Sequence, residues 1–414
     1  MMAQKPGVAE ALAGQTLLVT GASGFLGKAM LEKLLRTCPR IKRVYVVLRA
    51  RRGKAPRDRL RELLDGPVFD NIRRTDPGAL AKIVPLNGDC CEKRLGLSAD
   101  DASLVQAEVN VVVHTAASVR FDDPVKQAVL LNTRGAQEVC ALALGMSHLS
   151  ALVHVSTTYS NTNHPVIEER VYPATADWRE MIRLAETLTQ EEFDRQAPQH
   201  MGYHPNTYTF TKSLAEQVVN DHRDRLNVAI YRPSIVVGAV KEPMPGWVDN
   251  LNGPMALCVG VSKGLIHTAL ADENSVMDMV PVDIAVNGII LAIYETMMKM
   301  WRTYMKAYRA TLAIRYFTLH HWLFRNEKFF ELEKNLNEKD AVTFKLDQSK
   351  DVDIPEFMAV SMEGVRRYVL KENMDPVKAK RNQMTMYFID RAVRGLLLYF
   401  VATSTYGLVS GLLG

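Results

Sequence analysis

Two side chains capable of acid–base chemistry stand four residues apart in the segment YTFTK, which opens a helical pattern at Tyr208. Positions i and i+4 share one face of a helix, so the ammonium group of Lys212 can lie near the phenol of Tyr208. A nearby positive charge favours the ionised phenol, and we therefore expect Lys212 to lower the pKa of Tyr208 from its usual value of about 10. Such a pair can transfer a proton to or from a substrate oxygen.

Hydroxyl groups at the end of an apolar run are candidates for the same oxygen. Leu152–Ser156 is typical of a short buried strand, and Thr157 follows it directly. A hydroxyl beside Tyr208 would donate a second hydrogen bond where negative charge develops. We expect Thr157 to take this role, with Ser156 as the alternative. His114 ends another apolar run, but a histidine at a strand end more often satisfies a local hydrogen bond than it transfers protons.

A glycine-rich turn links the first apolar run, Thr16–Thr20, to a helical pattern that begins near Lys28. Its spacing, Gly-x-x-Gly-x-x-Gly, lets the backbone approach a pyrophosphate at the amide-rich start of the helix. Glycines alone are weak evidence, but a strand before them and a helix after them form the context of a dinucleotide site. The expected cofactor-binding residues of this turn are Thr20, Gly21, Ser23, Gly24, Phe25, Leu26 and Gly27.

Basic residues follow the second apolar run, Val44–Leu48, where an acidic residue would bind the ribose 2′-hydroxyl of NAD. This chain has Arg49, Arg51 and Arg52 there, and Arg49 and Arg52 are the expected cofactor-binding residues. Guanidinium groups match a phosphate in bidentate geometry, so we expect these arginines to bind a 2′-phosphate and NADPH to be the cofactor; a solvated basic loop is the alternative. Asp89 is expected to accept a hydrogen bond from the adenine amino group, or else to cap a helix. Ala116 would let the chain pass close to the dinucleotide.

The elements that must hold these residues alternate along the chain. Six short apolar runs, most of them separated by helical patterns, indicate a parallel sheet with helices on both faces. The expected fold class is therefore α/β, a Rossmann-like doubly wound parallel sheet. The runs are Thr16–Thr20, Val44–Leu48, Ile83–Leu86, Val109–His114, Leu152–Ser156 and Val228–Tyr231. Residues 164–205 are polar and predict an insertion without a strand, and from about residue 285 the pattern becomes helical.

The composition excludes several classes of protein. The chain has 414 residues, 47% of them hydrophobic, and can bury a large core. Its net charge of +5, from 51 basic and 46 acidic residues, is too small and dispersed for a nucleic-acid surface. The 5 cysteines show no spacing typical of a metal site. We expect neither a nucleic-acid partner nor a metal.

An uncharged run, Gly395–Gly414, follows Arg391 and Arg394. It is about as long as a helix must be to cross the ~30 Å hydrocarbon core of a bilayer. We expect a membrane anchor here, with a C-terminal helix packed on the soluble domain, or a shallow interfacial helix, as the alternative. The preceding arginines favour the cytosol for the rest of the chain. The expected domains are residues 14–285 (cofactor binding and reduction), 286–390 (helical) and 391–414 (anchor).

Longer stretches of the sequence resemble one family, and they cover most of residues 14–290. The similarity is carried by LLVTGASGFLGKAMLEKLLR, HTAASVRFD, HVSTTYSN, HPNTYTFTKSLAEQVV, YRPSIVVGAVKEPMPGWVDNLNGP and MVPVDIAVN. These stretches resemble eukaryotic fatty acyl-CoA reductases, members of the extended short-chain dehydrogenase/reductase superfamily. The resemblance implies that NADPH reduces a long-chain fatty acyl-CoA to a primary fatty alcohol with release of CoA, and that Lys212 binds the nicotinamide ribose hydroxyls. We expect a protein of the endoplasmic reticulum or peroxisome membrane.

The chain departs from the family pattern after about residue 300. A short stretch, WRTYMKAYRATLAIR, stands where the family has a longer segment, which puts the acyl-binding region in question and not the cofactor site. Two other functions stay open. One is a membrane-associated reductase or isomerase of another lipid, a sterol or a nucleotide sugar, and the other is an NADP-binding protein without catalytic activity.

Overall fold

The computed structural model describes residues 6–268, 272, 274, 276–299, 331, 353–369, 384, 387 and 391. The chain divides into two compact units, Met1–Arg315 and Tyr316–Gly414. The predicted anchor, residues 391–414, lies outside the described residues except for Arg391. Among the residues that are described, no helix is long and apolar enough to cross a bilayer. The predicted domain boundaries stay a prediction.

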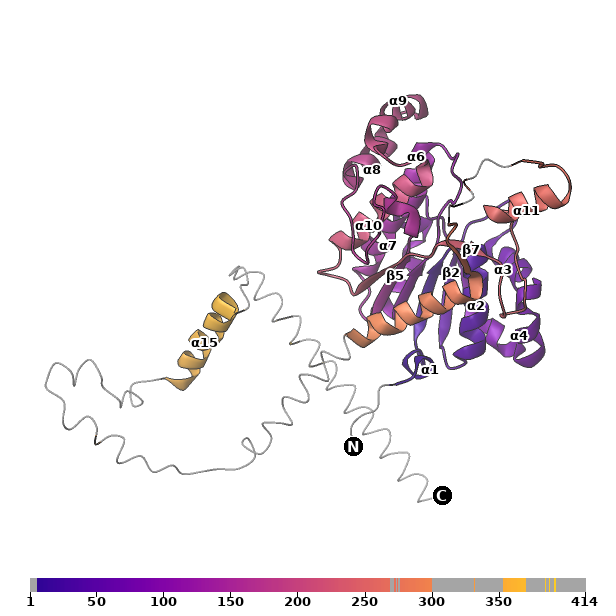
Figure 1. Ribbon diagram of the computed structural model, residues 1–414. Helices are drawn as coiled ribbons and strands as arrows, with labels where there is room; N and C mark the ends of the chain where they lie inside the picture. Colours follow the sequence, from indigo (N-terminus) through magenta and orange to yellow (C-terminus); the bar gives the residue numbers. More distant parts are fainter. Residues whose placement is uncertain are drawn as a thin grey trace, which may run out of the picture. The chain divides into compact units, whose positions relative to one another are not determined.

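The first unit is built on a six-stranded parallel sheet in the order β3-β2-β1-β4-β5-β6 (Figure 1). This order reverses direction between β1 and β4, as a doubly wound sheet requires, and it confirms the predicted Rossmann-like fold. The strands are β1 (Thr16–Thr20), β2 (Arg43–Leu48), β3 (Ile83–Asn87), β4 (Val111–His114), β5 (Ala151–Val155) and β6 (Val228–Tyr231). The predicted boundaries are the same for β1 and β6 and differ by one or two residues for the other four strands.

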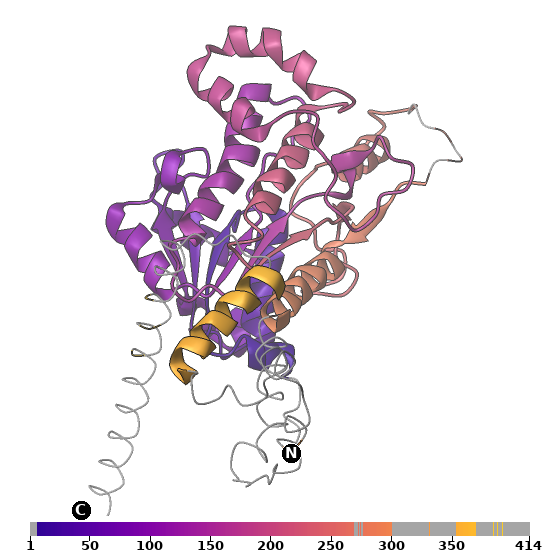
Figure 2. The ribbon, with the colours of Figure 1, turned by 90° about the vertical axis from the view of Figure 1, so that its left-hand side faces the viewer.

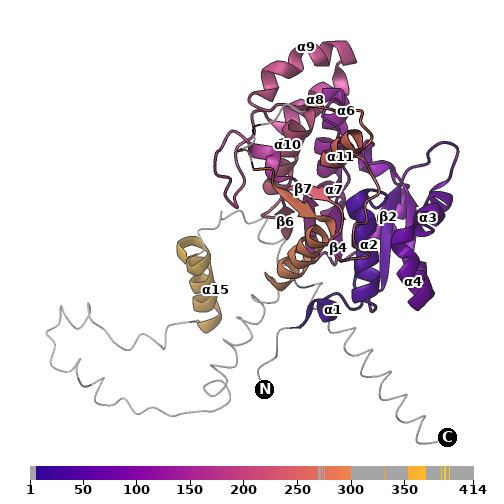
Figure 3. The same cartoon turned by 45° about the vertical axis from the view of Figure 1, so that its right-hand side comes forward.

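Helices cover both faces of the sheet because its strands are apolar on both sides. Leu17 and Val19 belong to one core cluster, together with α2 (Phe25–Thr37) and the helix of residues 282–299. Figures 1 and 3 show that helix, in orange, beside α2. Leu18, between them on β1, points to the opposite face. Three helices line the core on that face: α5 (Ala99–Glu108), α7 (Gly135–Ala143) and α10 (Thr207–Asp221).

The predicted insertion forms a helical pair and contains no strand. Its helices, α8 (Trp178–Thr187) and α9 (Gln190–Met201), bury apolar side chains in one cluster with α10. Figure 2 shows this part of the chain at the top of the view. Thr189 caps α9 together with Glu192 in a capping box. The side chain of Asn206 then caps α10 by accepting a 2.9 Å hydrogen bond from the amide of Thr209. This cap fixes the start of the helix that carries Tyr208.

Two strands were not predicted from the sequence. They are β7 (Ile235–Val237) and β8 (Met279–Pro281), which pair in parallel as a separate small sheet. Each has only three residues, too few for a period-2 pattern to be recognised. In the described part of the chain, the other α-helices are α1 (Val8–Ala11), α3 (Pro56–Leu64), α4 (Asp70–Thr75), α6 (Val125–Ala128), α11 (Pro254–Ser262) and, in the second unit, α15 (Ile354–Gly364).

Candidate active site

The glycine turn packs so closely that two of its positions exclude any side chain. Gly21 has a φ of +74°, and a Cβ there would lie 2.5 Å from the hydroxyl oxygen of Thr115 and 2.6 Å from the amide nitrogen of Ala116. A Cβ on Gly27 would lie 2.3 Å from the carbonyl oxygen of Gly21. Gly24 is the N-cap residue of α2. The backbone therefore forms a bare cradle at a helix N-terminus, which fits the pyrophosphate of a dinucleotide.

Thr20 and Ala116 meet beside this turn, at the carboxyl ends of β1 and β4. The Thr20 hydroxyl accepts a 3.3 Å hydrogen bond from the Ala116 amide and lies 2.7 Å from Nδ1 of His114. His114 is 1% exposed, and burial lowers the pKa of its ring to about 3. This histidine is neutral at physiological pH, and its ring makes the local contact with Thr20 that the sequence favoured. Ser23 is exposed, and Phe25 and Leu26 are half-buried.

Two of the predicted cofactor residues contact each other at the ends of β2 and β3. Arg49 Nη1 donates a 3.1 Å hydrogen bond to Asp89 Oδ2, and both side chains are accessible to solvent. Asp89 Oδ1 also accepts from the amide of Cys91, so this carboxylate is held by its own loop. Arg52 is exposed in a turn, with a φ of 52°. Arg59 of α3, which was not predicted, donates a 2.6 Å hydrogen bond to the carbonyl oxygen of Arg49.

The hydroxyl of Thr157 lies close enough to the phenol of Tyr208 to lower its pKa. Tyr208 lies in the first turn of α10, and Thr157 follows the end of β5. The centroid of the Phe121 ring lies 6.0 Å from that of the Tyr208 ring. Burial raises the pKa of Tyr208 to about 12, and the Thr157 contact opposes that rise. The phenol is therefore protonated at neutral pH.

Lys212 does not act on Tyr208 as the sequence led us to expect. Its ammonium group is buried and donates a 2.6 Å hydrogen bond to the carbonyl oxygen of Val155. Burial lowers the pKa of Lys212 to about 8, and the nearby carboxylate of Glu216 opposes this shift. The expectation that Lys212 lowers the pKa of Tyr208 is thus wrong for this structure, because burial of the phenol raises that pKa.

Ser156 and Thr157 take different partners although they are neighbours. Successive residues of an extended chain point in opposite directions. Ser156 Oγ donates a 2.6 Å hydrogen bond to Glu216 Oε1 of α10, and Thr157 contacts Tyr208. Both serine and threonine side chains are buried. The structure thus brings Thr157, and not Ser156, to the candidate proton donor.

A π-helix supports the middle of α10 from the side. Residues Val129–Arg134 have π-helical geometry between α6 and α7. Asn132 Nδ2 donates a 2.9 Å hydrogen bond to the hydroxyl of Thr211, and the Thr133 hydroxyl donates to the Thr211 carbonyl. Helix irregularities of this kind often occur at functional sites. Here the contacts fix Thr211, the residue next to Lys212. No motif of the sequence indicated this support.

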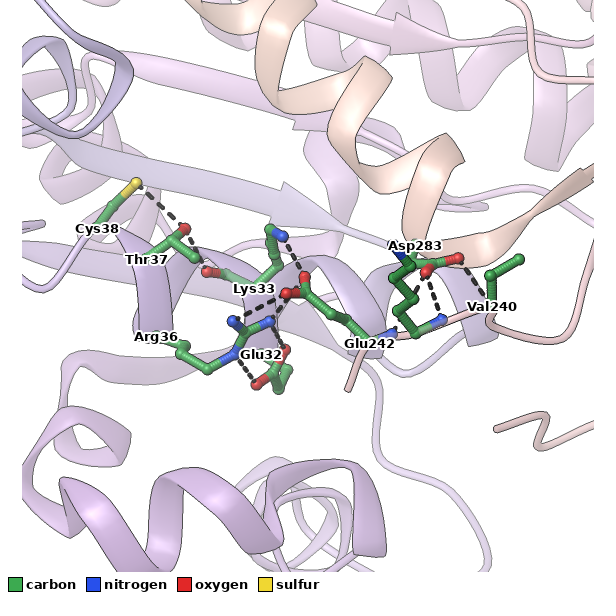
Figure 4. A network of polar contacts seen from close by, with 9 residues as sticks. Glu32, Lys33, Arg36, Thr37, Cys38, Val240, Glu242 and Asp283 are labelled. Atoms are coloured by element: carbon green, nitrogen blue, oxygen red, sulfur yellow. Dashed lines mark hydrogen bonds and ion pairs between the residues drawn. The ribbon is translucent and has the colours of Figure 1, made fainter. Parts of the chain in front are cut away.

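A polar network fastens the 238–250 loop to α2 (Figure 4). Arg36 donates hydrogen bonds to Glu32 at 2.6 Å and to Glu242 at 3.1 Å, and Lys33 also pairs with Glu242. Hydrogen bonds from these two cations lower the pKa of Glu242. Asp283, at the start of the helix of residues 282–299, accepts from the amide of Lys241 at 2.9 Å and from two neighbouring amides.

The same loop lies against the start of α2, next to the glycine turn. The ring of Trp247 lies 5.0 Å from that of Phe25, and the Trp247 side chain is buried. Asp249 forms an ion pair with Lys28. The loop that contains the PGWVDN stretch is therefore attached to the cofactor-binding helix.

Comparison with known proteins identifies the family. A family model described as "Male sterility protein" matches residues 19–289, and a second model with the same description matches residues 283–372. Fatty acyl-CoA reductase 1 of Rattus norvegicus is 32% identical over 90% of this chain and 88% of its own length. The chain belongs to the fatty acyl-CoA reductase family. It is thus an oxidoreductase of that family with a nucleotide-binding domain.

Other relatives of this reductase match in part. A putative fatty acyl-CoA reductase of Drosophila melanogaster is 40% identical over 71% of this chain and 57% of its own length. Among solved structures, the terminal reductase domain of the myxalamid biosynthetic pathway has a TM-score of 0.49 and 24% identity, over 67% of this chain and 62% of that chain. The alignment with the rat protein spans 452 positions, more than the 414 residues of this reductase. The rat protein therefore carries residues that have no counterpart here.

Proposed function

We propose that the protein reduces a long-chain fatty acyl-CoA to the primary fatty alcohol, with NADPH as reductant and release of CoA. One observation carries the proposal. A protonated phenol, Tyr208, and a hydroxyl, Thr157, lie near the end of β5, where Lys212 is bound to Val155. The same fold has a glycine cradle that fits a dinucleotide. The family, defined by its curated relatives, supplies the substrate class.

Tyr208 would donate its proton to the carbonyl oxygen of the thioester. A pKa of about 12 keeps the phenol protonated at neutral pH, as a donor must be. The Thr157 hydroxyl would support the same oxygen as negative charge develops on it. Bound NADPH supplies the hydride that reaches the carbonyl carbon. Thr157 is the supporting hydroxyl in this proposal, since the Ser156 hydroxyl is used by Glu216.

The reaction consumes two hydrides and two protons for each alcohol. In the first round the carbonyl carbon gains a hydride, its oxygen gains a proton, and the carbon–sulfur bond then breaks to leave an aldehyde and the CoA thiol. In the second round the aldehyde carbon and oxygen gain a hydride and a proton. Tyr208 would protonate the oxygen in each round. Lys212 would bind the ribose hydroxyls of the nicotinamide nucleotide, as the family resemblance implies.

The choice of NADPH over NADH rests on the arginines after β2. Arg49 and Arg52 are accessible where the adenosine ribose of a bound dinucleotide would lie, beyond the carboxyl end of the strand. Arg59 adds a third guanidinium, tied to the carbonyl oxygen of Arg49. A 2′-phosphate would be attracted by this group of positive charges. We further propose that Asp89 accepts from the adenine amino group while its other contacts remain.

We also propose that the run Gly395–Gly414 anchors the protein in the endoplasmic reticulum or peroxisome membrane, with the active domain in the cytosol. The run has no charge and follows Arg391 and Arg394. Long-chain alcohols partition into lipid, so an anchor would hold the active site beside its product pool.

Product analysis tests the proposal. Full-length purified protein is incubated with NADPH and palmitoyl-CoA, and products are identified by mass spectrometry. We expect hexadecanol and free CoA. Alcohol from a sterol ketone but not from palmitoyl-CoA would favour another lipid substrate. NADPH binding without any product would favour an inactive cofactor-binding protein, an outcome that the shorter chain makes worth testing.

A further inference from the structure

Glu216 is a buried carboxylate at which four hydrogen-bond donors converge. It lies one helical turn after Lys212 on α10 and is 1% exposed. Arg232 donates to it through Nε at 2.8 Å and through Nη2 at 2.7 Å. Ser156 Oγ lies 2.6 Å and Ser160 Oγ 3.0 Å from its Oε1 oxygen. A buried charge with this many donors is stable only while they are all held in position.

Arg232 connects this carboxylate to the end of β6 and to the segment of residues 168–170. It follows the last residue of β6, and its guanidinium also donates to the carbonyl oxygens of Arg170 at 2.8 Å and Glu168 at 3.3 Å. Next to it, the carbonyl oxygen of Pro233 accepts a 3.0 Å hydrogen bond from the amide of Thr158. The segment after β5 is therefore held on one side by backbone contacts and on the other by Glu216.

Thr157 lies between the two serines that contact Glu216. Ser156 and Ser160 bracket it in the chain, and its own hydroxyl contacts Tyr208, two turns before Glu216 on α10. A shift of this segment relative to α10 would separate the Thr157 hydroxyl from the phenol. Buried contacts at both ends prevent such a shift.

We propose that Glu216, clamped by Arg232, is a positioning residue that holds the Ser156–Ser160 segment against α10 so that Thr157 and Tyr208 face the same substrate oxygen. This role rests on the proposed function and adds to it. Neither Glu216 nor Arg232 would touch substrate. The two residues act through Ser156, Ser160 and the backbone between them.

Glu216 has a second link to the site, through charge. Its carboxylate raises the pKa of Lys212 and opposes the effect of burial. The other titratable groups facing Lys212 are His114 of β4 and His154 of β5, whose own pKa values are lowered by burial and by the Lys212 charge. Neutral histidines do not stabilise the ammonium, so Glu216 is the negative charge that does. Loss of that charge should let Lys212 lose its proton at a lower pH.

The test compares Glu216→Gln, Ser156→Ala and Ser156→Thr with wild type. Glu216→Gln keeps the shape but removes the charge, and Ser156→Ala removes one donor while the Arg232 pair remains. Glu186→Gln is the matched control, because Glu186 forms ion pairs with Arg134 and Lys93 that do not contact Thr157 or Tyr208. Turnover with palmitoyl-CoA, KM, NADPH affinity, the pH profile and the urea unfolding midpoint are measured for each full-length protein.

We expect Glu216→Gln to lower kcat on the order of 10-fold or more while KM and NADPH affinity change less than about 2-fold. Its loss of activity at alkaline pH should begin at a lower pH than in wild type. Ser156→Ala should lower kcat by about 3-fold or more, and Ser156→Thr, which keeps the hydroxyl, should restore it. If Glu216→Gln does not fold, the serine pair still tests the positioning.

The proposal is overturned if Glu216→Gln and Ser156→Ala both keep the wild-type kcat and pH profile and only their urea unfolding midpoint falls. That result would show a purely structural role. In that case the wild type and Glu186→Gln still make alcohol, and the proposed function stands. If wild type itself makes no alcohol, the proposed function and the positioning role are both rejected.

Discussion

The ammonium group of Lys212 donates a 2.6 Å hydrogen bond to the carbonyl oxygen of Val155, the last residue of β5. Lys212 is therefore held at the carboxyl end of β5. It lies one helical turn after Tyr208 on α10, and its ammonium group bonds to Val155 rather than to the Tyr208 hydroxyl. Burial gives Lys212 a pKa of about 8 and Tyr208 a pKa of about 12. The two groups thus titrate in different pH ranges, and different measurements can separate their roles.

The pH profile should report Lys212. Because its pKa is lowered to about 8, the charged form is present below that pH and is lost as the pH rises through it. Tyr208 stays protonated over this range. We expect kcat to fall between about pH 7 and about pH 9, with a midpoint near the Lys212 pKa of about 8. Lys212→Arg, whose guanidinium stays charged, should lose this fall; a wild-type kcat that is constant to about pH 9.5 would remove Lys212 from the account.

Tyr208→Phe should abolish most of the activity and leave cofactor binding intact. The variant lacks the proton donor for the substrate oxygen, so we expect turnover to drop on the order of 10²-fold or more. NADPH affinity, measured by fluorescence titration, should be unchanged. Tyr203→Phe is the control, since Tyr203 is partly exposed and its hydroxyl is 3.5 Å from Asn161. Equal turnover in the two variants would mean that Tyr208 is not the donor.

The sequence predicted what depends on local pattern. The parallel sheet followed from apolar runs between helices, and the glycine turn followed from its place between a strand and a helix. Spacing alone showed that Tyr208 and Lys212 share a helix face, but not that the Lys212 ammonium bonds to Val155. That contact depends on how deeply α10 packs on the sheet, and so does the burial that raises the Tyr208 pKa.

Contacts between distant segments could not be predicted. Glu216 and Arg232 are ordinary charged residues in the sequence, and only the fold brings them together. Thr157 was the expected hydroxyl from the sequence, but Ser156 stayed an alternative until the direction of the chain after β5 was known. The three-residue strands β7 and β8 pair segments more than 40 residues apart, and neither has a pattern long enough to show it.

Arg49→Ser should change the choice of cofactor. If the Arg49 guanidinium binds the 2′-phosphate, its loss should weaken NADPH on the order of 10-fold and leave NADH nearly unaffected. Dissociation constants for both cofactors check this. Arg61→Ser is the control, because Arg61 lies nearby on α3, is exposed and pairs with Asp58. An equal loss of affinity for both cofactors would contradict the 2′-phosphate assignment.

Acid should destabilise the fold through two buried histidines. His114 and His154 stack with ring centroids 5.2 Å apart and are at most 1% exposed. Burial lowers the pKa of His114 to about 3 and holds that of His154 well below its usual value. The unfolded chain protonates both below about pH 6.5, so the free energy of unfolding should fall by about 1.4 kcal/mol per pH unit for each histidine below that pH.

Urea unfolding at about pH 7 and about pH 5 checks this prediction. The variant His154→Leu should lose less stability than wild type over that interval, because one of the two histidines no longer titrates. His148→Leu, at an exposed position, should behave as wild type. The same pH dependence in His154→Leu and wild type would show that His154 does not contribute to acid unfolding.

Truncation after Arg394 should release the protein from membranes. The deleted residues form the uncharged run proposed as the anchor. After carbonate extraction we expect the full-length protein in the membrane pellet and the truncated protein in the supernatant. Substitution of Ser404 and Thr405 by leucine, which keeps the run apolar, should leave the full-length protein in the pellet. Identical partitioning of the full-length and truncated proteins would contradict the anchor.

Isotope transfer is the most direct test of the central claim, that the Tyr208 site reduces an acyl-CoA twice. The full-length protein is incubated with palmitoyl-CoA and NADPH that carries deuterium at the transferred position, and the products are analysed by mass spectrometry. The account predicts hexadecanol with two deuterium atoms on its first carbon, one free CoA per alcohol, and loss of this product in Tyr208→Phe. Palmitoyl-CoA that stays intact, or deuterated alcohol formed equally well by Tyr208→Phe, would contradict it.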